Sequence, residues 1–200
     1  MTSPPNATCG SGAFEGAISK YGGEGLTTIG NAKPVSICGS GLLDIVAYLL
    51  EKGLINSEGT LQESFLVSPG DKNGVESDII LNQKDVREVQ LAKAAIAAGI
   101  TLLLKHSGFD FEQVDRLFLA GGFGNYMNIE SALRIGLLPP QMEGKIVQVG
   151  NTAGTGAHLS VKSEKFIIDI EKVKERMDYV ELSYDEDFPQ EFAMQMNFNR

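Results

Sequence analysis

The feature that most constrains the fold is an apolar run followed at once by a glycine-rich stretch and a helix-forming sequence. Residues 117–120 form a continuous apolar run, as in a strand that is buried on both faces. Residues 121–125 predict a loop, Asn128 is placed to cap a helix, and Gly136 is placed to end it. Strand, glycine loop and helix in this order are typical of α/β folds, so we expect a partly parallel sheet with helices on both faces.

The remainder of the 200 residues continues this alternation. Apolar residues at helical spacing predict a helix from Leu42 to Leu50 that stops at Gly53. A long helix is predicted to begin with a capping box of Asp85 and Glu88 and to end at Gly108. The other predicted elements are strands at 65–67, 79–81, 145–149 and 179–182, a helix starting near Ala153, and a last helix with Phe166, Ile170, Val173 and Met177 on one face.

The length suits a single domain over residues 1–200. Residues 1–34 are rich in glycine, serine, threonine and proline, and they predict a loop-rich start with a short helix near residues 13–20. No internal repeat and no convincing linker divides the chain.

The net charge of -9 argues against binding to nucleic acid or to an anionic membrane, because both need a basic face. Part of the excess lies near the C-terminus, and we interpret this cluster as a solvated acidic surface, although it could also attract or repel a partner. The cluster consists of Glu181, Asp185, Glu186, Asp187 and Glu191.

The two cysteines, Cys9 and Cys38, do not form a C-x-x-C pair, so we expect no zinc ribbon and no iron–sulfur cluster in this chain. The N-terminus is polar and has no apolar signal core, and the apolar runs are too short to cross a bilayer. These observations predict a cytoplasmic protein with free thiols and no membrane contact.

Three glycine-rich stretches are candidates for ligand contact, because a backbone without side chains can approach a ligand closely. At residues 121–125, a ligand loop and a tight strand-to-helix turn both remain open. At residues 39–41 and 150–156, we favour glycines that allow close packing. The stretch at 150–156 would then be a small-residue helix start.

Neither of the two common phosphate-binding motifs is present. A dinucleotide fingerprint that starts at Gly122 would need glycine or alanine where Met127 stands. A P-loop needs Gly-Lys followed by serine or threonine, but Gly144 and Lys145 are followed by Ile146.

Several stretches, in order along the chain, match one known family. The most specific is Leu-Ala-Gly-Gly-Phe-Gly-Asn-Tyr at 119–126, and the others are residues 8–10 with 16–18, 33–44, 128–130, 134–139, 150–151 and 179–183. Together they resemble the C-terminal region of the reductive activators of corrinoid proteins. The resemblance covers nearly all residues from 7 to 198.

This resemblance implies an actin-like, ribonuclease H-like ATPase fold that binds ATP with magnesium in the full-length family. It implies ATP-dependent reduction of cobalt(II) corrinoid to cobalt(I), which restores the corrinoid protein of a methyltransferase system. A Gly-Gly loop like that at Gly121 and Gly122 contacts adenosine in this superfamily, and a small-residue helix like that near Ala153 acts as a hinge. The implied nucleotide-binding residues are Gly121, Gly122, Phe123, Gly124 and Asn125, with Gly39, Ser40 and Gly41 as a weaker second contact.

The sequence also departs from the family. Its Asp-Ile pairs at 44–45, 78–79 and 169–170 are not followed by glycine, so both phosphate loops of the Asp-Ile-Gly-Thr type are absent, as are the iron–sulfur cysteines. We therefore expect the last part of a longer activator, lacking its first strands. This part would supply only the adenosine side of the nucleotide site. We assign no catalytic residue in it, and we expect no activity from it alone.

Alternatives remain open at this point. The chain could be a docking module for a corrinoid protein or for self-association with a vestigial nucleotide site, since an exposed sheet edge favours a homodimer. An unrelated small-molecule enzyme is a third reading, but no cluster of ionisable residues supports it.

Several single residues can likewise be interpreted either as ligand-binding or as structural. Asn125 could bind a base or ribose, or it could cap the following turn. Asp44 could face a phosphate-bound metal, or it could complement a helix dipole. His106 suits the end of a helix, and with His158 it is poor evidence for a metal site.

Overall fold

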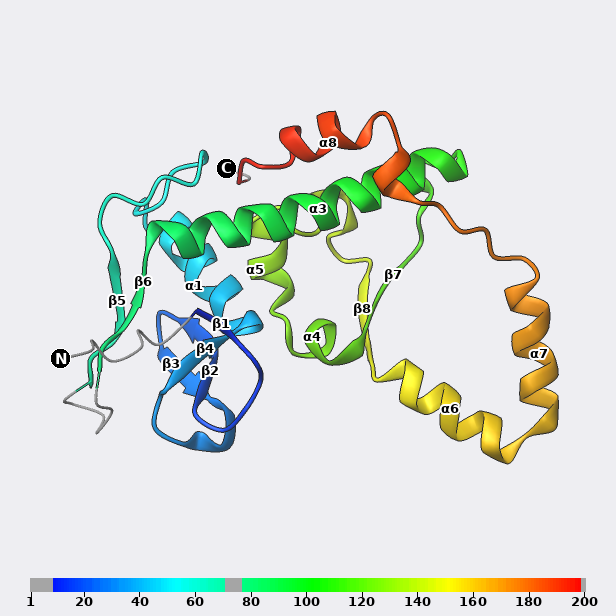
Figure 1. The fold of residues 1–200 in the computed structure, drawn as a ribbon, viewed down its shortest axis with the longest axis horizontal. Helices are drawn as coiled ribbons and strands as arrows, with labels where there is room; N and C mark the ends of the chain where they lie inside the picture. Colours follow the sequence, from blue (N-terminus) through cyan, green and yellow to red (C-terminus); the bar gives the residue numbers. More distant parts are fainter. Residues whose placement is uncertain (1–8, 71–76, 199–200) are drawn as a thin grey trace.

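The computed structural model describes residues 9–70 and 77–198. Its first part is a four-stranded sheet of β1 (Cys9–Ser11), β2 (Ala17–Gly22), β3 (Gly25–Thr28) and β4 (Ser36–Cys38), in the order β1-β4-β2-β3 (Figure 1). Strand β4 pairs in parallel with β1 and β2, and β2 pairs antiparallel with β3. The predicted loop-rich start therefore contains three strands, and the helix predicted near residues 13–20 is wrong.

Helix α1 (Gly39–Glu51) follows β4 directly and lies on β2. The approach is close because Gly41 has no side chain: a Cβ at this position would lie 2.2 Å from the carbonyl oxygen of Ile18. The predicted apolar face is buried, and Gly53 follows the helix with a left-handed φ of 69°. The predictions for this helix are confirmed.

Strands β5 (Phe65–Ser68) and β6 (Ile79–Leu81) form an antiparallel pair that leads into α3 (Gln83–Ser107). The capping box at the start of α3 is formed by Asn82 and Asp85, each side chain accepting from the other residue's backbone N–H. The box predicted for Asp85 and Glu88 is thus wrong by one turn, because Asn82 already satisfies the first N–H groups. Gly108 ends the helix in the left-handed region, as predicted.

The second part of the fold is the parallel pair β7 (Leu117–Ala120) and β8 (Ile146–Gly150). Between them lie α4 (Gly121–Tyr126), α5 (Ile129–Arg134) and η3 (Pro140–Met142), and Asn128 caps α5 as predicted. Two further 3-10 turns are η1 (Ile29–Asn31) and η2 (Phe111–Gln113). Strands alternate with helices and the sheets are partly parallel, which confirms the predicted α/β class.

Only one face of the β7–β8 pair is covered. Leu117, Leu119 and Ile146 pack against the core, whereas Phe118 and its register partner Val147 are exposed. The prediction of strands buried on both faces is therefore wrong in this structure.

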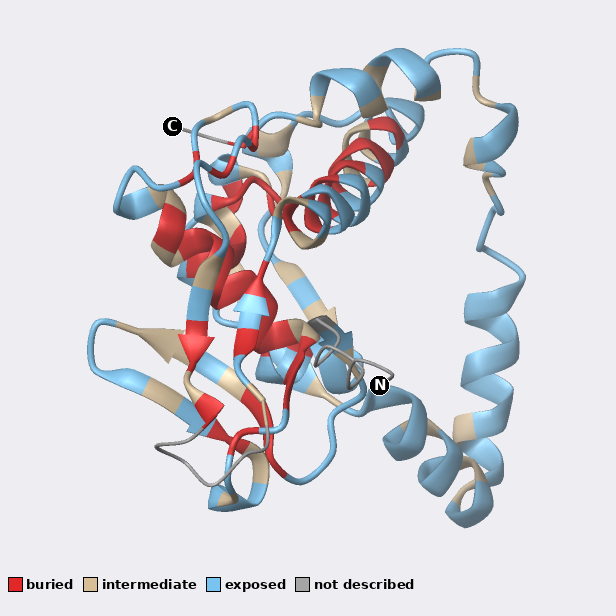
Figure 2. Ribbon diagram, turned by 60° about the vertical axis from the view of Figure 1, so that its left-hand side comes forward, coloured by how far each residue is buried: buried red, intermediate tan, exposed pale blue. Residues whose placement is uncertain are grey.

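Helices α6 (Thr152–Lys162) and α7 (Glu164–Lys174) form an arm that projects from the body (Figure 1). Neither helix has a buried residue, and the ribbon of the arm in Figure 2 is exposed apart from a few segments of intermediate burial. A Cβ at Gly156 would meet nothing within 4 Å, so the close packing predicted for 150–156 is wrong. The apolar residues predicted to share one face of the last helix do lie on α7 or just after it, where Ile170, Val173 and Met177 are exposed and Phe166 is partly buried.

The chain returns from the arm to the body through an extended segment, a 3-10 turn η4 (Leu182–Tyr184) and α8 (Phe188–Met194). Helix α8 packs along α3 (Figure 1). The strand predicted at 179–182 is wrong, because these residues have no neighbouring strand in the described part of the chain.

By length and composition alone, α3 is long and apolar enough to cross a membrane, which the apolar runs in the sequence did not predict. The core helix of a soluble protein passes the same test. Here Val86, Val89 and Leu102 are buried in the interior, and 44% of the most apolar stretch of the helix is buried.

The C-terminal segment is held by two buried polar side chains of α3. Lys93 is 1% exposed and donates to the carbonyl oxygen of Asn197 at 2.5 Å, and its Nζ lies 5.8 Å from the ring centre of Phe198. Gln90 donates to the carbonyl oxygen of Met196 at 2.9 Å. Burial lowers the pKa of Lys93 to about 8, because the ammonium form loses hydration.

We expect a pH-dependent stability difference between the wild type and Lys93→Met. The pKa of Lys93 in the folded protein lies below the ordinary lysine value of about 10.4, so burial of the charged side chain costs stability. This cost is fully present below about pH 8 and is gone above about pH 10.4, where the side chain is neutral in both the folded and the unfolded protein. The wild type should therefore gain stability relative to the variant as pH rises through this window, by up to about 3 kcal/mol.

Urea unfolding between pH 7 and pH 10.5 measures this difference. Lys84→Met, at an exposed position of the same helix, controls for the loss of one positive charge. Parallel stability curves for the wild type and Lys93→Met would contradict the burial argument.

Candidate nucleotide site

The carboxyl end of β7 leads directly into the predicted glycine stretch. Gly121 turns the chain with a φ of 84°, and α4 begins there, so the expected loop is a short helix. Gly121, Gly122, Phe123 and Asn125 are exposed, whereas Gly124 is buried against Leu119.

The three glycines of α4 differ in whether the local structure requires a glycine at that position. Gly121 needs its left-handed backbone, and a Cβ at Gly124 would lie 3.3 Å from the Cβ of Leu119. At Gly122 a Cβ would meet nothing within 4 Å, and the backbone is not left-handed. Local structure therefore does not require glycine at 122, and its backbone is open to a ligand.

The second predicted contact, at the start of α1, lies beside this stretch. A Cβ at Gly39 would lie 2.8 Å from Cε2 of Phe123, so the fold brings the two glycine stretches together. Ser40 is turned inward, and its hydroxyl donates to the carbonyl oxygen of Ser19 at 3.0 Å. Because Gly41 is also buried, only Gly39 of this group stays partly accessible.

The carboxyl end of β8 lies close to Asn125 of α4. The side-chain Oδ1 of Asn125 would lie 3.7 Å from a Cβ at Gly150, the last residue of β8. The Asn125 side chain makes no hydrogen bond within residues 9–70 and 77–198, and Asn128, rather than Asn125, caps the following helix. Asn125 is therefore free to bind a ligand at the end of two parallel strands, where open α/β sheets bind ligands.

Sequence reasoning missed Gln148, which fixes this region. Its Nε2 donates to the carbonyl oxygens of Gly124 at 2.8 Å, Asn125 at 3.2 Å and Met127 at 2.9 Å. One side chain on β8 thus holds the backbone of α4. A lone glutamine in an apolar strand is the signal that could have indicated it.

Asp44 has neither of its predicted roles. It is buried between α1, β2 and α5, and its Oδ2 accepts from the N–H of Tyr21 at 3.2 Å. Burial raises the pKa of Asp44, and the nearby Ser131 hydroxyl, the Tyr21 N–H and the charge of Lys20 lower it by smaller amounts. It is not exposed as a metal ligand at the end of β7.

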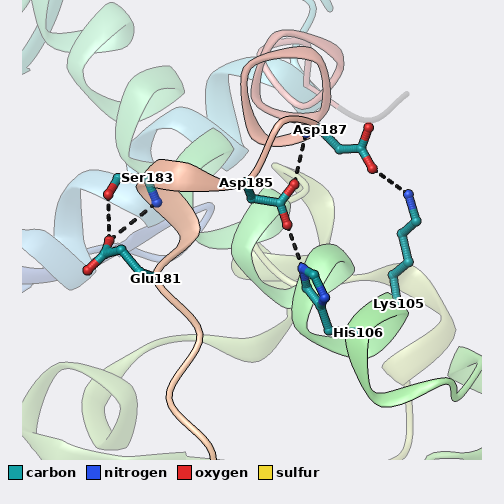
Figure 3. A network of polar contacts seen from close by, with 6 residues as sticks. All are labelled: Lys105, His106, Glu181, Ser183, Asp185 and Asp187. Atoms are coloured by element: carbon teal, nitrogen blue, oxygen red, sulfur yellow. Dashed lines mark hydrogen bonds and ion pairs between the residues drawn. The ribbon is translucent and has the colours of Figure 1, made fainter.

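The acidic C-terminal segment is only partly a solvated surface. Asp185 lies 2.5 Å from Nε2 of His106, and Asp187 lies 2.5 Å from Nζ of Lys105, both at the end of α3 (Figure 3). The hydrogen bond from His106 lowers the pKa of Asp185. These contacts tie the segment that returns from the arm to the body, beside a cavity of about 530 Å3.

The residues that the structure describes contain no group of three or more His, Cys, Asp or Glu side chains able to hold a metal ion. His106 pairs with Asp185 and His158 lies on the arm. Cys38 is a buried free thiol whose Sγ lies 3.2 Å from the carbonyl oxygen of Ile18.

The fold and this site define the chain as a domain of the ASKHA class, the actin-like ATPases. A family model described as the C-terminal domain of RACo, the ASKHA domain, matches residues 5–200, and the chain belongs to this family. In solved structures, the protein described as "Reductive activator for corrinoid,iron-sulfur protein" superimposes with a TM-score of 0.84 and 32% identity, over 93% of this chain and 33% of that one.

Two curated relatives carry related descriptions. The corrinoid activation enzyme RamQ of Eubacterium limosum is 35% identical over 96% of this chain and 36% of its own length. The [Co(II) methylated amine-specific corrinoid protein] reductase of Methanosarcina barkeri is 28% identical over 82% of this chain and 29% of its own length. The chain thus spans about a third of the length of the relatives it matches.

Two glycine substitutions should separate packing from ligand contact. Gly41→Ala should destabilise the fold by about 2 kcal/mol or more, because its Cβ would overlap the Ile18 carbonyl. Gly122→Ala should change stability by less than about 1 kcal/mol, because its Cβ points into open space. Urea unfolding of both variants tests this, and equal losses would show that Gly122 also packs.

Proposed function

We propose that this chain is the nucleotide-binding C-terminal part of a corrinoid activator and that it supplies the adenosine side of an ATP site. The observation that carries the proposal is the open backbone at Gly122, at the carboxyl ends of β7 and β8, beside the side chain of Asn125, which has no hydrogen-bond partner among the described residues. Membership of an ASKHA family supports a nucleotide as the ligand.

The geometry suits adenosine better than phosphate. The exposed ring of Phe123 offers an apolar surface, Asn125 offers a donor and an acceptor, and Gly122 lets a ligand approach the main chain. The sequence has no glycine hairpin after its Asp-Ile pairs, so the triphosphate and its magnesium ion would be bound by residues outside this chain.

The descriptions of the relatives support a proposal for the activity of the complete protein. Their descriptions concern corrinoid activation and the reduction of a cobalt(II) corrinoid protein. We propose that ATP bound in part by this chain is coupled to the one-electron reduction of cobalt(II) corrinoid to cobalt(I). The corrinoid protein of a methyltransferase system would be the partner, and the electron would come from a redox centre outside this chain.

Calorimetric titration of ATP and ADP into the purified chain tests the adenosine site. We expect saturable binding that Gly122→Asp weakens at least about tenfold, because a carboxylate would fill the open approach and repel the nucleotide. Gly156→Asp adds the same charge at another glycine with open space, on the arm, and should bind like the wild type. Equal binding by both variants would place the nucleotide elsewhere.

A second candidate function, docking through self-association, has its own structural support. The β7–β8 pair has free strand edges within the described residues, and its outer face exposes Phe118, Val147 and Val149. An unpaired strand edge can pair with a strand of another chain, and an exposed apolar patch is often covered by a partner. In this second proposal, the outer face of the β7–β8 pair joins two copies of the chain.

Light scattering over a wide concentration range tests the homodimer. We expect a dimer that Phe118→Asp weakens, because the aspartate would place a charge in the buried interface. Ile168→Asp makes a similar change on the arm and should leave the dimer intact. A monomer at every concentration would count against self-association without affecting the nucleotide proposal.

A further inference from the structure

A small cavity lies beside α1, and its lining includes no residue of α4. It has a volume of about 230 Å3 and is bounded by the turn between β2 and β3, the second half of α1, and α5. This is below the roughly 300–1,000 Å3 of pockets that hold drug-sized ligands, so a nucleotide would not fit. Its lining includes Tyr21, Asp44, Ala47, Tyr48, Ser131 and Arg134.

The carboxyl group of Asp44 belongs to this lining and is incompletely paired. The residue is 4% exposed, and only its Oδ2 is bonded, to the Tyr21 N–H. Its Oδ1 has no hydrogen-bond partner in the described part of the chain. The Ser131 hydroxyl is near enough to lower the pKa of this group but makes no hydrogen bond to Oδ1.

Buried polar atoms in folded proteins are almost always paired, so this oxygen calls for a donor. Gly22 and Gly23 of the turn leave the cavity free of side chains on one side. A donor that enters the cavity would complete the pairing that the protein itself leaves open.

The charges around the cavity leave a small negative excess. Glu51 and Glu130 add two carboxyl groups to that of Asp44, and the two cations of the lining, Lys52 and Arg134, both pair with Glu51, at 3.5 Å and 3.6 Å. The carboxyl groups of Asp44 and Glu130 therefore favour a positively charged donor. The rings of Tyr21 and Tyr48 meet edge to face with centroids 5.3 Å apart, and aromatic rings stabilise cations. The Nζ of Lys52 already lies 5.4 Å from the centre of the Tyr48 ring, which shows that a cation is accommodated beside this pair.

We propose that this cavity binds a small protonated alkylamine. One N–H of the ammonium group donates to Oδ1 of Asp44, and the alkyl group lies against the two tyrosine rings. The described residues contain no group of three or more His, Cys, Asp or Glu side chains able to hold a metal ion. The proposal is independent of nucleotide binding.

Titration with methylammonium chloride, followed by NMR of the backbone amides, tests the site. We expect saturable shifts at Tyr21, Ala47 and Ser131 that sodium chloride at the same ionic strength does not cause. Tetramethylammonium has the charge but no N–H, and it should bind at least about tenfold more weakly. Equal binding of both cations would overturn the role of Oδ1.

Two variants complete the test. Asp44→Asn keeps the shape but removes the charge and should weaken methylammonium binding about tenfold or more. Ala47→Leu keeps the carboxyl group and fills the cavity, so it should abolish the shifts even if Asp44→Asn fails to fold. Absence of saturable shifts in the wild type would show that water alone pairs with Asp44, and it would overturn the proposal.

Discussion

The structure depends on the close contact between α1 and β2. Because Gly41 has no side chain, the helix lies against the carbonyl group of Ile18, and the apolar face of α1 becomes part of the core. The same contact sets the position of the first two turns of the helix. Its first residue, Gly39, is held against Phe123 of α4, and its second turn brings Asp44 to the N–H of Tyr21. The candidate nucleotide site and the Asp44 cavity therefore share one rigid support.

Much of this arrangement could be predicted from local sequence. The helix from Leu42, the strands at 65–67, 79–81 and 117–120, the cap at Asn128 and the stop at Gly108 all depend on neighbours in the chain, and all are confirmed. The errors occur where contacts with residues distant in the sequence determine the secondary structure or the burial. Residues 17–20 were predicted as part of a short helix, but pairing of β2 with β3 and β4 places them in a sheet. Burial was overestimated at β7 and β8, because an apolar pattern shows which face can be covered without showing what covers it.

The candidate site shows the same division. The sequence motif located the glycines of α4, but it could not separate Gly122, which is open, from Gly124, which packs on Leu119. It also could not show that Ser40 and Gly41 turn into the core while Gly39 stays partly accessible. Gln148 acts through hydrogen bonds to backbone carbonyl groups far along the chain, and no residue pattern reports such contacts. Its importance became visible only in three dimensions.

The arm of α6 and α7 has a consequence for cooperativity. Each helix has 11 residues, a length at which an isolated helix is marginal in water, and neither is supported by buried contacts. We therefore expect local unfolding of the arm to cost far less free energy than global unfolding of the chain. The amide protons of α6 and α7 would then exchange with solvent through local fluctuations. The core around α1 and α3 forms a separate cooperative unit, joined to the arm through β8 and the ion pairs at the end of α3. The arm can thus reorganise while the support of the candidate site stays folded.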